Sequence, residues 1–179
     1  MNDLNSFIEQ SFGLATVFGQ ILLVTLCILF LVHKISKGKR FTELFGLISS
    51  NYLILSFFIA LFAAAGSLVL SEIVNLPPCE LCWYQRIFVY PQVIIFGIAA
   101  LKNDFKVRVY SLVLSVIGAL IALYHIFLQL YPAILPPCSD EVVSCTTKQF
   151  VVYGYVTIPV MSLTIFLMLI FLGLAAKRR

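Results

Sequence analysis

The chain has 179 residues, of which 61% are hydrophobic and 11% are charged, and its mean hydropathy is +1.05. Soluble domains contain roughly 45–50% apolar residues and about 25% charged residues, so the composition excludes a soluble globular protein. The formal net charge of +4 does not indicate nucleic-acid binding, because most of the basic residues lie in clusters at the ends of apolar segments, as in a membrane protein.

Five apolar segments of the chain are long enough to cross a bilayer. A hydrocarbon core of about 30 Å requires roughly 20 helical residues. Helices satisfy every backbone amide where water is absent, and the apolar runs are too continuous for the alternating strands of a membrane barrel. The sequence therefore predicts an all-α integral membrane protein. Its expected spans are residues 14–32, 47–70, 83–101, 109–131 and 153–176.

The positions of lysine and arginine predict the orientation, because these residues accumulate in the cytoplasmic loops of membrane proteins. In a five-span chain, ten of the 12 share one side, namely Lys34, Lys37, Lys39, Arg40, Lys102, Lys106, Arg108, Lys177, Arg178 and Arg179. The N-terminus and residues 71–80 and 132–152 fall on the other side, with most of the acidic residues. We therefore expect the N-terminus outside and the C-terminus in the cytoplasm.

The first span, residues 14–32, is expected to remain in the protein as a helix. A signal peptide carries a basic flank and a small-residue cleavage site, whereas this segment has an acidic flank and no such site after Val32. Basic residues follow it, as they follow a retained helix. Cys27 lies within this span and is interpreted as a packing residue.

A Cys-x-x-Cys motif precedes the third span, in the order Pro77-Pro78-Cys79-Glu80-Leu81-Cys82. Such a pair closes a small ring whose thiols have a tunable pKa and redox potential. The prolines favour an extended approach, and the start of the helix then places Cys82 in the first turn. Free backbone N–H groups and the positive end of the helix stabilise a thiolate there. The motif alone leaves a structural disulfide or half of a metal site open.

Cys138 and Cys145 form a second close pair in the outer segment 132–152, which a soluble protein can reach. All four cysteines of the two pairs thus fall on the outer side, where thiols persist as disulfides. This placement favours redox chemistry, with two structural disulfides as the alternative. A zinc ion held by four thiolates is disfavoured by the spacing of the second pair and by the oxidising side, so no metal is expected.

Polar residues within the spans mark a candidate binding site, because ionisable groups in a bilayer are energetically costly. Arg86 lies one helical turn beyond Cys82 on the same face, about 6 Å deeper. His125 lies about 9 Å from the outer end of the fourth span, and Gln129 lies one turn above it. A quinone suits such a site, because it joins a polar head to an apolar tail and accepts the two electrons that a dithiol yields. An arginine that reaches the lipid headgroups and a histidine that only packs are the alternatives.

Three motifs taken together resemble the DsbB family of disulfide-bond formation proteins, over residues 43–179. The motifs are Pro78-Cys79-x-x-Cys82-x-Tyr84-x-Arg86, His125-x-x-x-Gln129-x-Tyr131-Pro132 and Gly154-x-x-x-Ile158-Pro159. The first opens a helix, the second leads to the outer segment that carries Cys138, and the third opens the last helix. The short spacing between Cys138 and Cys145 resembles the compact, BdbC-like forms from Gram-positive bacteria.

The resemblance implies a four-helix transmembrane bundle in the bacterial cell membrane, with the disulfides Cys79–Cys82 and Cys138–Cys145. In the family, the second pair exchanges with a soluble thioredoxin-fold disulfide oxidase of the DsbA type. The first pair then takes the electrons and passes them to a quinone, either ubiquinone or menaquinone. The resemblance places Cys82 against the quinone, with Arg86 supporting that contact.

Residues 43–179 are accordingly expected to form the redox domain. Residues 1–42 would add a transmembrane helix and a basic cytoplasmic linker, which we expect not to be needed for the chemistry. Two other functions stay open. One is a vitamin K epoxide reductase-like enzyme, although there the Cys-x-x-Cys lies near the end of the bundle's sequence. The other is a small transporter or assembly protein stapled by disulfides, for which the sequence has no inverted repeat.

Overall fold

The computed structural model describes residues 2–36, 39–132 and 144–176 of the chain. Within these ranges the secondary structure is helical apart from turns, short connections and one isolated β-bridge. The helices are α1 (Asn2–Ser36), α2 (Lys39–Ser50), α3 (Tyr52–Leu68), α4 (Glu80–Lys102), α5 (Val107–Leu130) and α6 (Ile158–Ala175). A π-helical turn, η1 (Val69–Ile73), extends α3.

Five of these helical segments are long and apolar enough to cross a membrane. They are Asp3–Ile35, Tyr52–Ile73, Glu80–Lys102, Val107–Leu130 and Ile158–Ala175. Each corresponds to one of the five spans predicted from the sequence. The predicted all-α membrane protein, with an additional N-terminal helix, is therefore confirmed.

The second span begins later than predicted, because a short helix precedes it. The predicted segment 47–70 starts inside α2, and the helix is interrupted at Asn51. The side-chain amide of Asn51 donates to the carbonyl oxygen of Leu47 at 2.9 Å. Such local hydrogen bonds compete with the regular helix, and hydropathy does not report them.

The last span also begins later, at Ile158 instead of residue 153. Tyr153 and Gly154 have φ angles of 54° and 78°, in a turn closed by the Val152–Val156 bridge. A left-handed conformation at successive residues ends any helical path. The helix starts only after this turn, with Pro159 in its first turn, where a proline is well tolerated.

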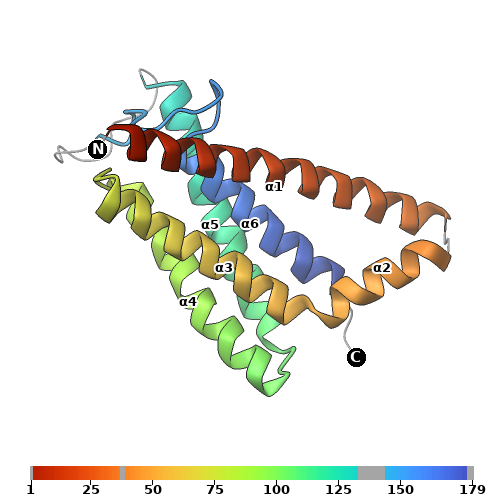
Figure 1. Cartoon of the computed structure of the whole chain (residues 1–179). Helices are drawn as coiled ribbons and strands as arrows, with labels where there is room; N and C mark the ends of the chain where they lie inside the picture. Colours follow the sequence, from red (N-terminus) through yellow and green to blue (C-terminus); the bar gives the residue numbers. More distant parts are fainter. Residues whose placement is uncertain (1, 37–38, 133–143, 177–179) are drawn as a thin grey trace.

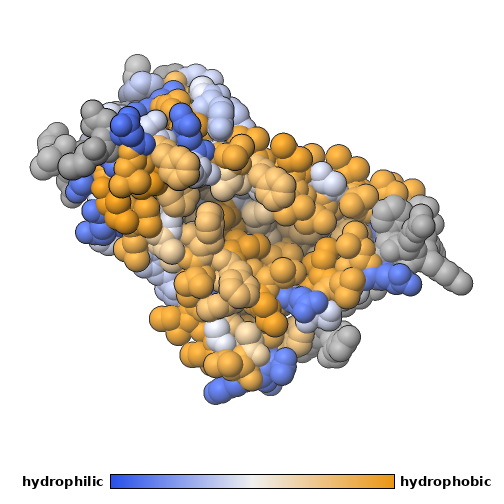
Figure 2. Space-filling model, viewed as in Figure 1, coloured by the Kyte–Doolittle hydropathy of each residue, from blue (hydrophilic) through white to orange (hydrophobic). Residues whose placement is uncertain are grey.

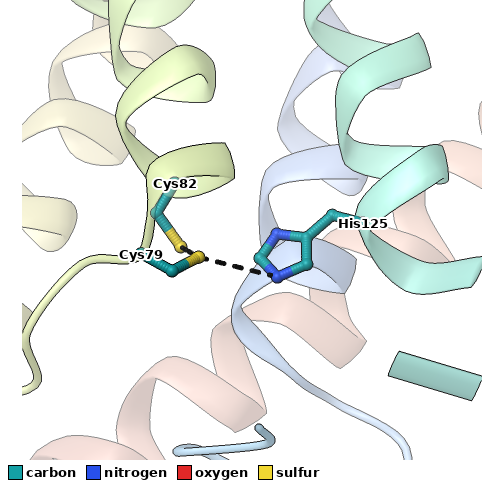
Figure 3. A group of neighbouring side chains, drawn as sticks. All are labelled: Cys79, Cys82 and His125. Atoms are coloured by element: carbon teal, nitrogen blue, oxygen red, sulfur yellow. Dashed lines mark hydrogen bonds between the residues drawn. The ribbon is translucent and has the colours of Figure 1, made fainter. Parts of the chain in front are cut away.

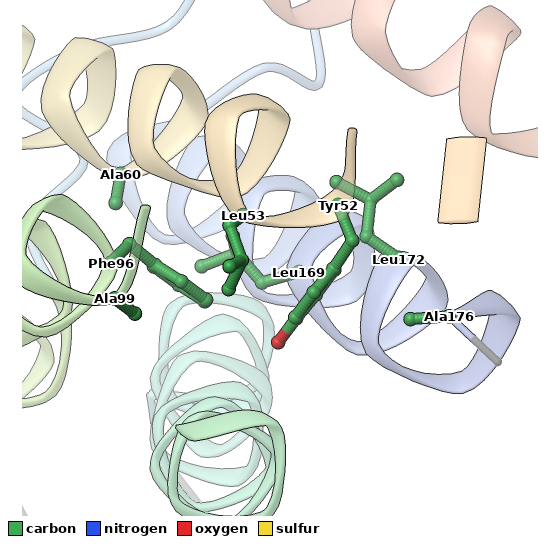
Figure 4. Close-up of a cluster of buried hydrophobic side chains, with 8 residues drawn as sticks. All are labelled: Tyr52, Leu53, Ala60, Phe96, Ala99, Leu169, Leu172 and Ala176. Atoms are coloured by element: carbon green, nitrogen blue, oxygen red, sulfur yellow. The ribbon is translucent and has the colours of Figure 1, made fainter. Parts of the chain in front are cut away.

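Helices α3, α4, α5 and α6 form an antiparallel bundle in which each packs against the next and α6 returns to α3 (Figure 1). Buried side chains from α3, α4, α6 and the C-cap residue of α6 face one another in a core cluster, shown in Figure 4: Tyr52, Leu53, Ala60, Phe96, Ala99, Leu169, Leu172 and Ala176. The rings of Tyr52 and Phe96 meet edge to face, with 5.8 Å between centroids. Close packing of this kind holds helices together within lipid.

The ends of the helices gather at two opposite ends of the bundle (Figure 1). The N-terminus, the α3–α4 connection and residues 144–157 lie at one end, and the α4–α5 turn and the C-terminal end of α6 lie at the other. In the view of Figure 2, hydrophobic residues cover most of the surface between these ends, and strongly hydrophilic residues gather near them. This is the surface of a multi-pass membrane protein. The predicted direction of insertion stays a prediction.

Candidate active site

The Cys-x-x-Cys motif lies at the start of α4, as its sequence predicts. Cys79 is the N-cap residue, with an extended backbone (φ −74°, ψ 172°), and Cys82 lies in the first turn. The backbone N–H of Trp83 donates to the carbonyl oxygen of Cys79 at 3.1 Å and begins the helix. The two sulfur atoms are 3.1 Å apart, beyond the roughly 2.05 Å of a disulfide. The structure therefore shows the pair as two thiols in contact (Figure 3).

The Cys79 thiol is buried and holds its proton. Its hydrogen bond with Cys82 and, next, its burial raise the pKa of Cys79 to about 12, while the contact with His125 acts in the opposite direction. At neutral pH Cys79 is therefore a thiol that can donate to the Cys82 sulfur. Within the pair, Cys79 is the proton carrier.

His125 extends from α5 towards the cysteine pair and is only 2% exposed. Its Nε2 atom lies 3.8 Å from the Cys79 sulfur, the contact drawn in Figure 3, and 3.1 Å from the carbonyl oxygen of Cys145. Its Nδ1 atom lies 3.1 Å from Nε2 of Gln85. Because an amide nitrogen only donates, Nδ1 accepts in this amide orientation, and the imidazole proton is on Nε2. That proton is directed to the Cys145 carbonyl and to the Cys79 sulfur.

Cys145 lies beside the first pair. It is 1% exposed and shares a buried cluster with Cys79, Leu81 and Leu128, against which Cys82 packs. Of the two cysteines in the outer segment, Cys145 thus lies against the first pair. Cys138 lies outside the described residues, so its position and the disulfide Cys138–Cys145 stay predictions.

The guanidinium group of Arg86 is held by the end of α3. Its Nε donates to the hydroxyl of Ser67 at 2.9 Å, and its Nη2 donates to the Ser67 carbonyl oxygen at 3.2 Å and to the Ser71 hydroxyl. The ring of Trp83 lies below it, 5.0 Å from the guanidinium carbon. Ser71 belongs to the π-helical turn η1, a feature that often occurs at functional sites. Arg86 is thereby fixed between α3 and α4.

A cavity of about 390 Å³ joins these residues. Five of the predicted site residues line it, namely Cys79, Cys82, Arg86, His125 and Gln129. The rest of its wall is mainly apolar and includes Phe58, Phe62, Val89, Ile165 and Met168. Helical spacing predicted a similar depth for Arg86 and His125, and the packing of α4 against α5 brings all five residues to one cavity. The cavity thus has a polar end and apolar walls.

Three residues of the site were missed by the sequence reasoning. Gln85 lines the cavity, is 4% exposed and orients His125, and its Oε1 is buried without a hydrogen-bond partner. Its position three residues after Cys82, on the same helical face, was a usable signal. Ser67 and Ser71 give no such signal, because small hydroxyl residues are common in transmembrane helices.

The donor atoms of Cys79, Cys82 and His125 lie within 4.8 Å of one another, as a thiophilic metal requires. A tetrahedral zinc site takes a fourth ligand and deprotonated donors. Here Nε2 of His125 carries a proton that is directed to the Cys145 carbonyl, and Cys79 holds its own proton. The arrangement suits thiol–disulfide exchange better than metal binding.

Comparison with known proteins identifies the segment that carries the site. Residues 49–176 match the family model described as disulfide bond formation protein DsbB. The chain is 41% identical over 121 residues to disulfide bond formation protein C of Bacillus subtilis (strain 168), over 66% of this chain and 87% of that protein. It is 42% identical over 131 residues to a probable disulfide formation protein C of Halalkalibacterium halodurans, over 72% and 94% of the two chains.

A third relative, a probable disulfide formation protein of Oceanobacillus iheyensis, is 39% identical over 133 residues, which cover 73% of this chain and 91% of that protein. No solved structure gives a significant match. The family segment begins within α2 and includes the whole four-helix bundle. Helix α1 therefore lies outside the part that matches the family.

Proposed function

We propose, because the chain belongs to the DsbB family of disulfide bond formation proteins, that it reoxidises a soluble thioredoxin-fold disulfide oxidase of the DsbA type and passes the electrons to a membrane quinone. Membership of this family implies a membrane thiol oxidase and does not support the two other functions considered from the sequence. The identity of the partner and of the electron acceptor is our proposal. The proposed orientation places both cysteine pairs on the outer side of the membrane.

The observation that carries the proposal is the cavity beside Cys82. Its polar end holds the Arg86 guanidinium and the unpartnered Gln85 Oε1, while its walls are apolar. A quinone matches this division, because a carbonyl oxygen can accept from the Arg86 guanidinium, a hydroxyl of the reduced quinol can donate to Gln85 Oε1, and the tail is a hydrocarbon. Arg86 would polarise one carbonyl oxygen, and Cys82 would face the ring. A bound quinone supplies an acceptor for two electrons and two protons.

The proposed exchange keeps electrons and atoms in balance. A thiolate of the reduced partner attacks Cys138 of the Cys138–Cys145 disulfide and releases the Cys145 thiolate. This thiolate attacks Cys79 of the Cys79–Cys82 disulfide and releases Cys82 as a thiolate. The partner's second thiolate then displaces Cys138, which attacks Cys145, re-forms the outer disulfide and releases Cys79. The Cys79–Cys82 dithiol finally gives up two electrons and two protons and returns to the disulfide.

Two features of the described residues support the inner part of this relay. Cys145 packs in the same buried cluster as Cys79, so its sulfur has a short path to that target. The Nε2–H of His125 donates to the Cys145 carbonyl oxygen and so holds Cys145 near Cys79. The same proton favours a negative charge on the Cys79 sulfur. Cys138, the proposed entry point, lies outside the described residues.

The proposal is tested with the purified protein in nanodiscs, reduced DsbA-type partner and a soluble quinone analogue. We expect loss of the quinone absorbance in a one-to-one ratio to partner oxidised, and none with Cys82→Ala. Arg86→Ala should raise KM for quinone by about tenfold or more, because a charge-assisted hydrogen bond contributes about 1.5–3 kcal/mol. Arg86→Lys should restore little of the affinity for quinone, since a lysine ammonium cannot reproduce the guanidinium hydrogen bonds to both Ser67 and Ser71. Partner oxidation without quinone reduction would refute the proposal.

The order of the relay has its own test. A partner that lacks its resolving cysteine should be trapped as a mixed disulfide, and mass spectrometry identifies the attached residue. Attachment at Cys138 is expected. Attachment at Cys145 would exchange the roles within the outer pair, and attachment at Cys79 would overturn the relay.

A further inference from the structure

We propose that α1 is the outer wall of the quinone cavity and binds the apolar tail of the quinone, while the headgroup lies at Cys82. This inference rests on the proposed function. It concerns the helix that lies outside the family segment, and the expectation that this helix is not needed for the thiol chemistry stays a prediction.

Helix α1 is attached to α6 and to the turn before it by polar contacts of Gln20. Gln20 donates from Nε2 to the Thr164 hydroxyl at 3.2 Å, and its Oε1 accepts from the Tyr155 hydroxyl at 2.8 Å. Polar side chains that bond across transmembrane helices stabilise their association. A Cβ atom added at Gly13 would lie 2.6 Å from Val152, so the backbone of α1 approaches this side closely. The position of α1 on α6 is therefore specific.

The same helix reaches α3 on its other side. The ring of Phe12 packs over Gly66, where an added Cβ would lie 2.8 Å away, and its centroid lies 6.0 Å from that of Phe62. Helix α1 thus contacts α3 through Phe12 and α6 through Gln20. It bridges the two helices that flank the cavity and closes the space between them.

The stripe of α1 that faces the cavity is almost entirely apolar. It consists of Phe12, Ala15, Thr16, Phe18, Gly19 and Leu22. These positions follow the helical repeat and extend over about 15 Å along the axis. The hydroxyl of Thr16 donates to the Phe12 carbonyl of its own helix at 2.8 Å, so it is satisfied without a ligand. The unpartnered Gln85 Oε1 and the Arg86 guanidinium line the same cavity from α4, and α1 contributes no such group.

Because the polar groups are on α4 and the apolar stripe is on α1, the two helices would bind different parts of a quinone. The headgroup needs hydrogen-bond donors and a nearby thiolate, which α4 offers at Arg86 and Cys82. The hydrocarbon tail needs a long apolar surface, which the α1 stripe offers opposite Phe58 and Phe62 of α3. Phe18 and Leu22 are 67% and 40% exposed, so they lie at the mouth, where a tail would leave for the lipid.

The test compares quinone analogues with and without a ten-carbon tail, in nanodiscs and with the full chain. Phe18→Ala and Leu22→Ala together should raise KM for the tailed analogue about fivefold, because apolar contact area is lost, and leave KM for the tail-less analogue unchanged. Ile21→Ala is the matched control, since Ile21 is similarly exposed at 61% but does not line the cavity. These exposed positions are suited to substitution without loss of folding.

A second readout does not depend on turnover. A quinone analogue with a photoreactive group on its tail should label residues 12–22, and unlabelled tailed quinone should compete. Labelling of α1 that quinone does not displace would mean that lipid acyl chains occupy the stripe, and it would overturn the inference. An unchanged KM for both analogues, or an equal rise for both, would also overturn it. If the wild-type chain reduces neither analogue, the proposed function itself fails.

Discussion

At the scale of single residues, the imidazole of His125 connects Cys79 to Cys145 through one proton. That proton is directed to the Cys145 carbonyl and the Cys79 sulfur, and Gln85 holds the ring in the tautomer that permits it. The depth of His125 in its span was enough to predict that its side chain belongs to the candidate binding site. It could not indicate the contact with Cys145, because that contact depends on the path of the connection between α5 and α6.

We expect His125→Phe to slow the transfer between the pairs about tenfold, because loss of a buried hydrogen bond costs about 1–1.5 kcal/mol. Oxidation of a chemically reduced Cys79–Cys82 pair by quinone should change much less. Rapid-mixing measurements of quinone absorbance separate the two steps. Tyr124→Phe, at the neighbouring and exposed position, is the control. An equal loss in both steps would assign His125 to quinone binding instead.

The Cys79 thiol should show an unusual pH dependence in the reduced protein. Its pKa is raised from 9.0 to about 12, so below pH 9 its thiolate fraction is about a thousandfold lower than that of an ordinary thiol. Alkylation by iodoacetamide, followed by mass spectrometry of the Cys79 peptide, should rise about tenfold per pH unit up to about pH 11. Cys82→Ala removes the largest cause and should shift the profile to lower pH. A wild-type plateau near pH 9 would contradict this assignment.

At the scale of helices, hydropathy predicted the five spans and failed at their ends. The start of α6 depends on the left-handed Tyr153 and Gly154, and the break before α3 depends on a side-chain hydrogen bond of Asn51. Neither feature changes the mean hydropathy of a window. The docking of α1 was not predicted, although Gln20, a polar residue within an apolar span, was a usable signal for the face that meets its neighbours.

The docking of α1 should depend on Gln20. We expect Gln20→Leu to lower the free energy of unfolding in detergent by about 1 kcal/mol, because hydrogen bonds between transmembrane helices contribute about that amount. A double-mutant cycle with Thr164→Val should give a coupling energy of about 0.6 kcal/mol. Thr25→Val is the control, since the Thr25 hydroxyl bonds only to the Ile21 carbonyl of α1 itself. Additive effects would show that the contact does not hold the helix.

At the scale of the whole molecule, the basic clusters predicted which connections share a side, and the arrangement of the helix ends agrees with it (Figure 1). The direction of insertion is a separate matter, because a bundle has the same contacts either way round. The charge distribution is the argument for placing the N-terminus outside.

Single cysteines at exposed sites test that direction. Ser6→Cys, near the N-terminus, should react with a membrane-impermeant maleimide applied to intact cells, above the background of the unsubstituted protein. Asn103→Cys, in the α4–α5 turn, should react only after the membrane is permeabilised. The opposite pattern would show that the protein is inserted the other way round, with both cysteine pairs on the cytoplasmic side. The native pairs are poor reporters, because Cys79 and Cys145 are buried.

The position of the cavity at the same end of the bundle as the cysteine segments has an energetic consequence. In the proposed cycle, the thiols deliver their electrons and protons from one aqueous side, and the cavity receives them in the half of the bilayer nearest that side. No charge therefore crosses the full membrane during turnover. The membrane voltage, which is worth about 2.3 kcal/mol per elementary charge at 100 mV, neither drives nor opposes the reaction. In the proposed cycle, free energy is stored only in the reduced quinone.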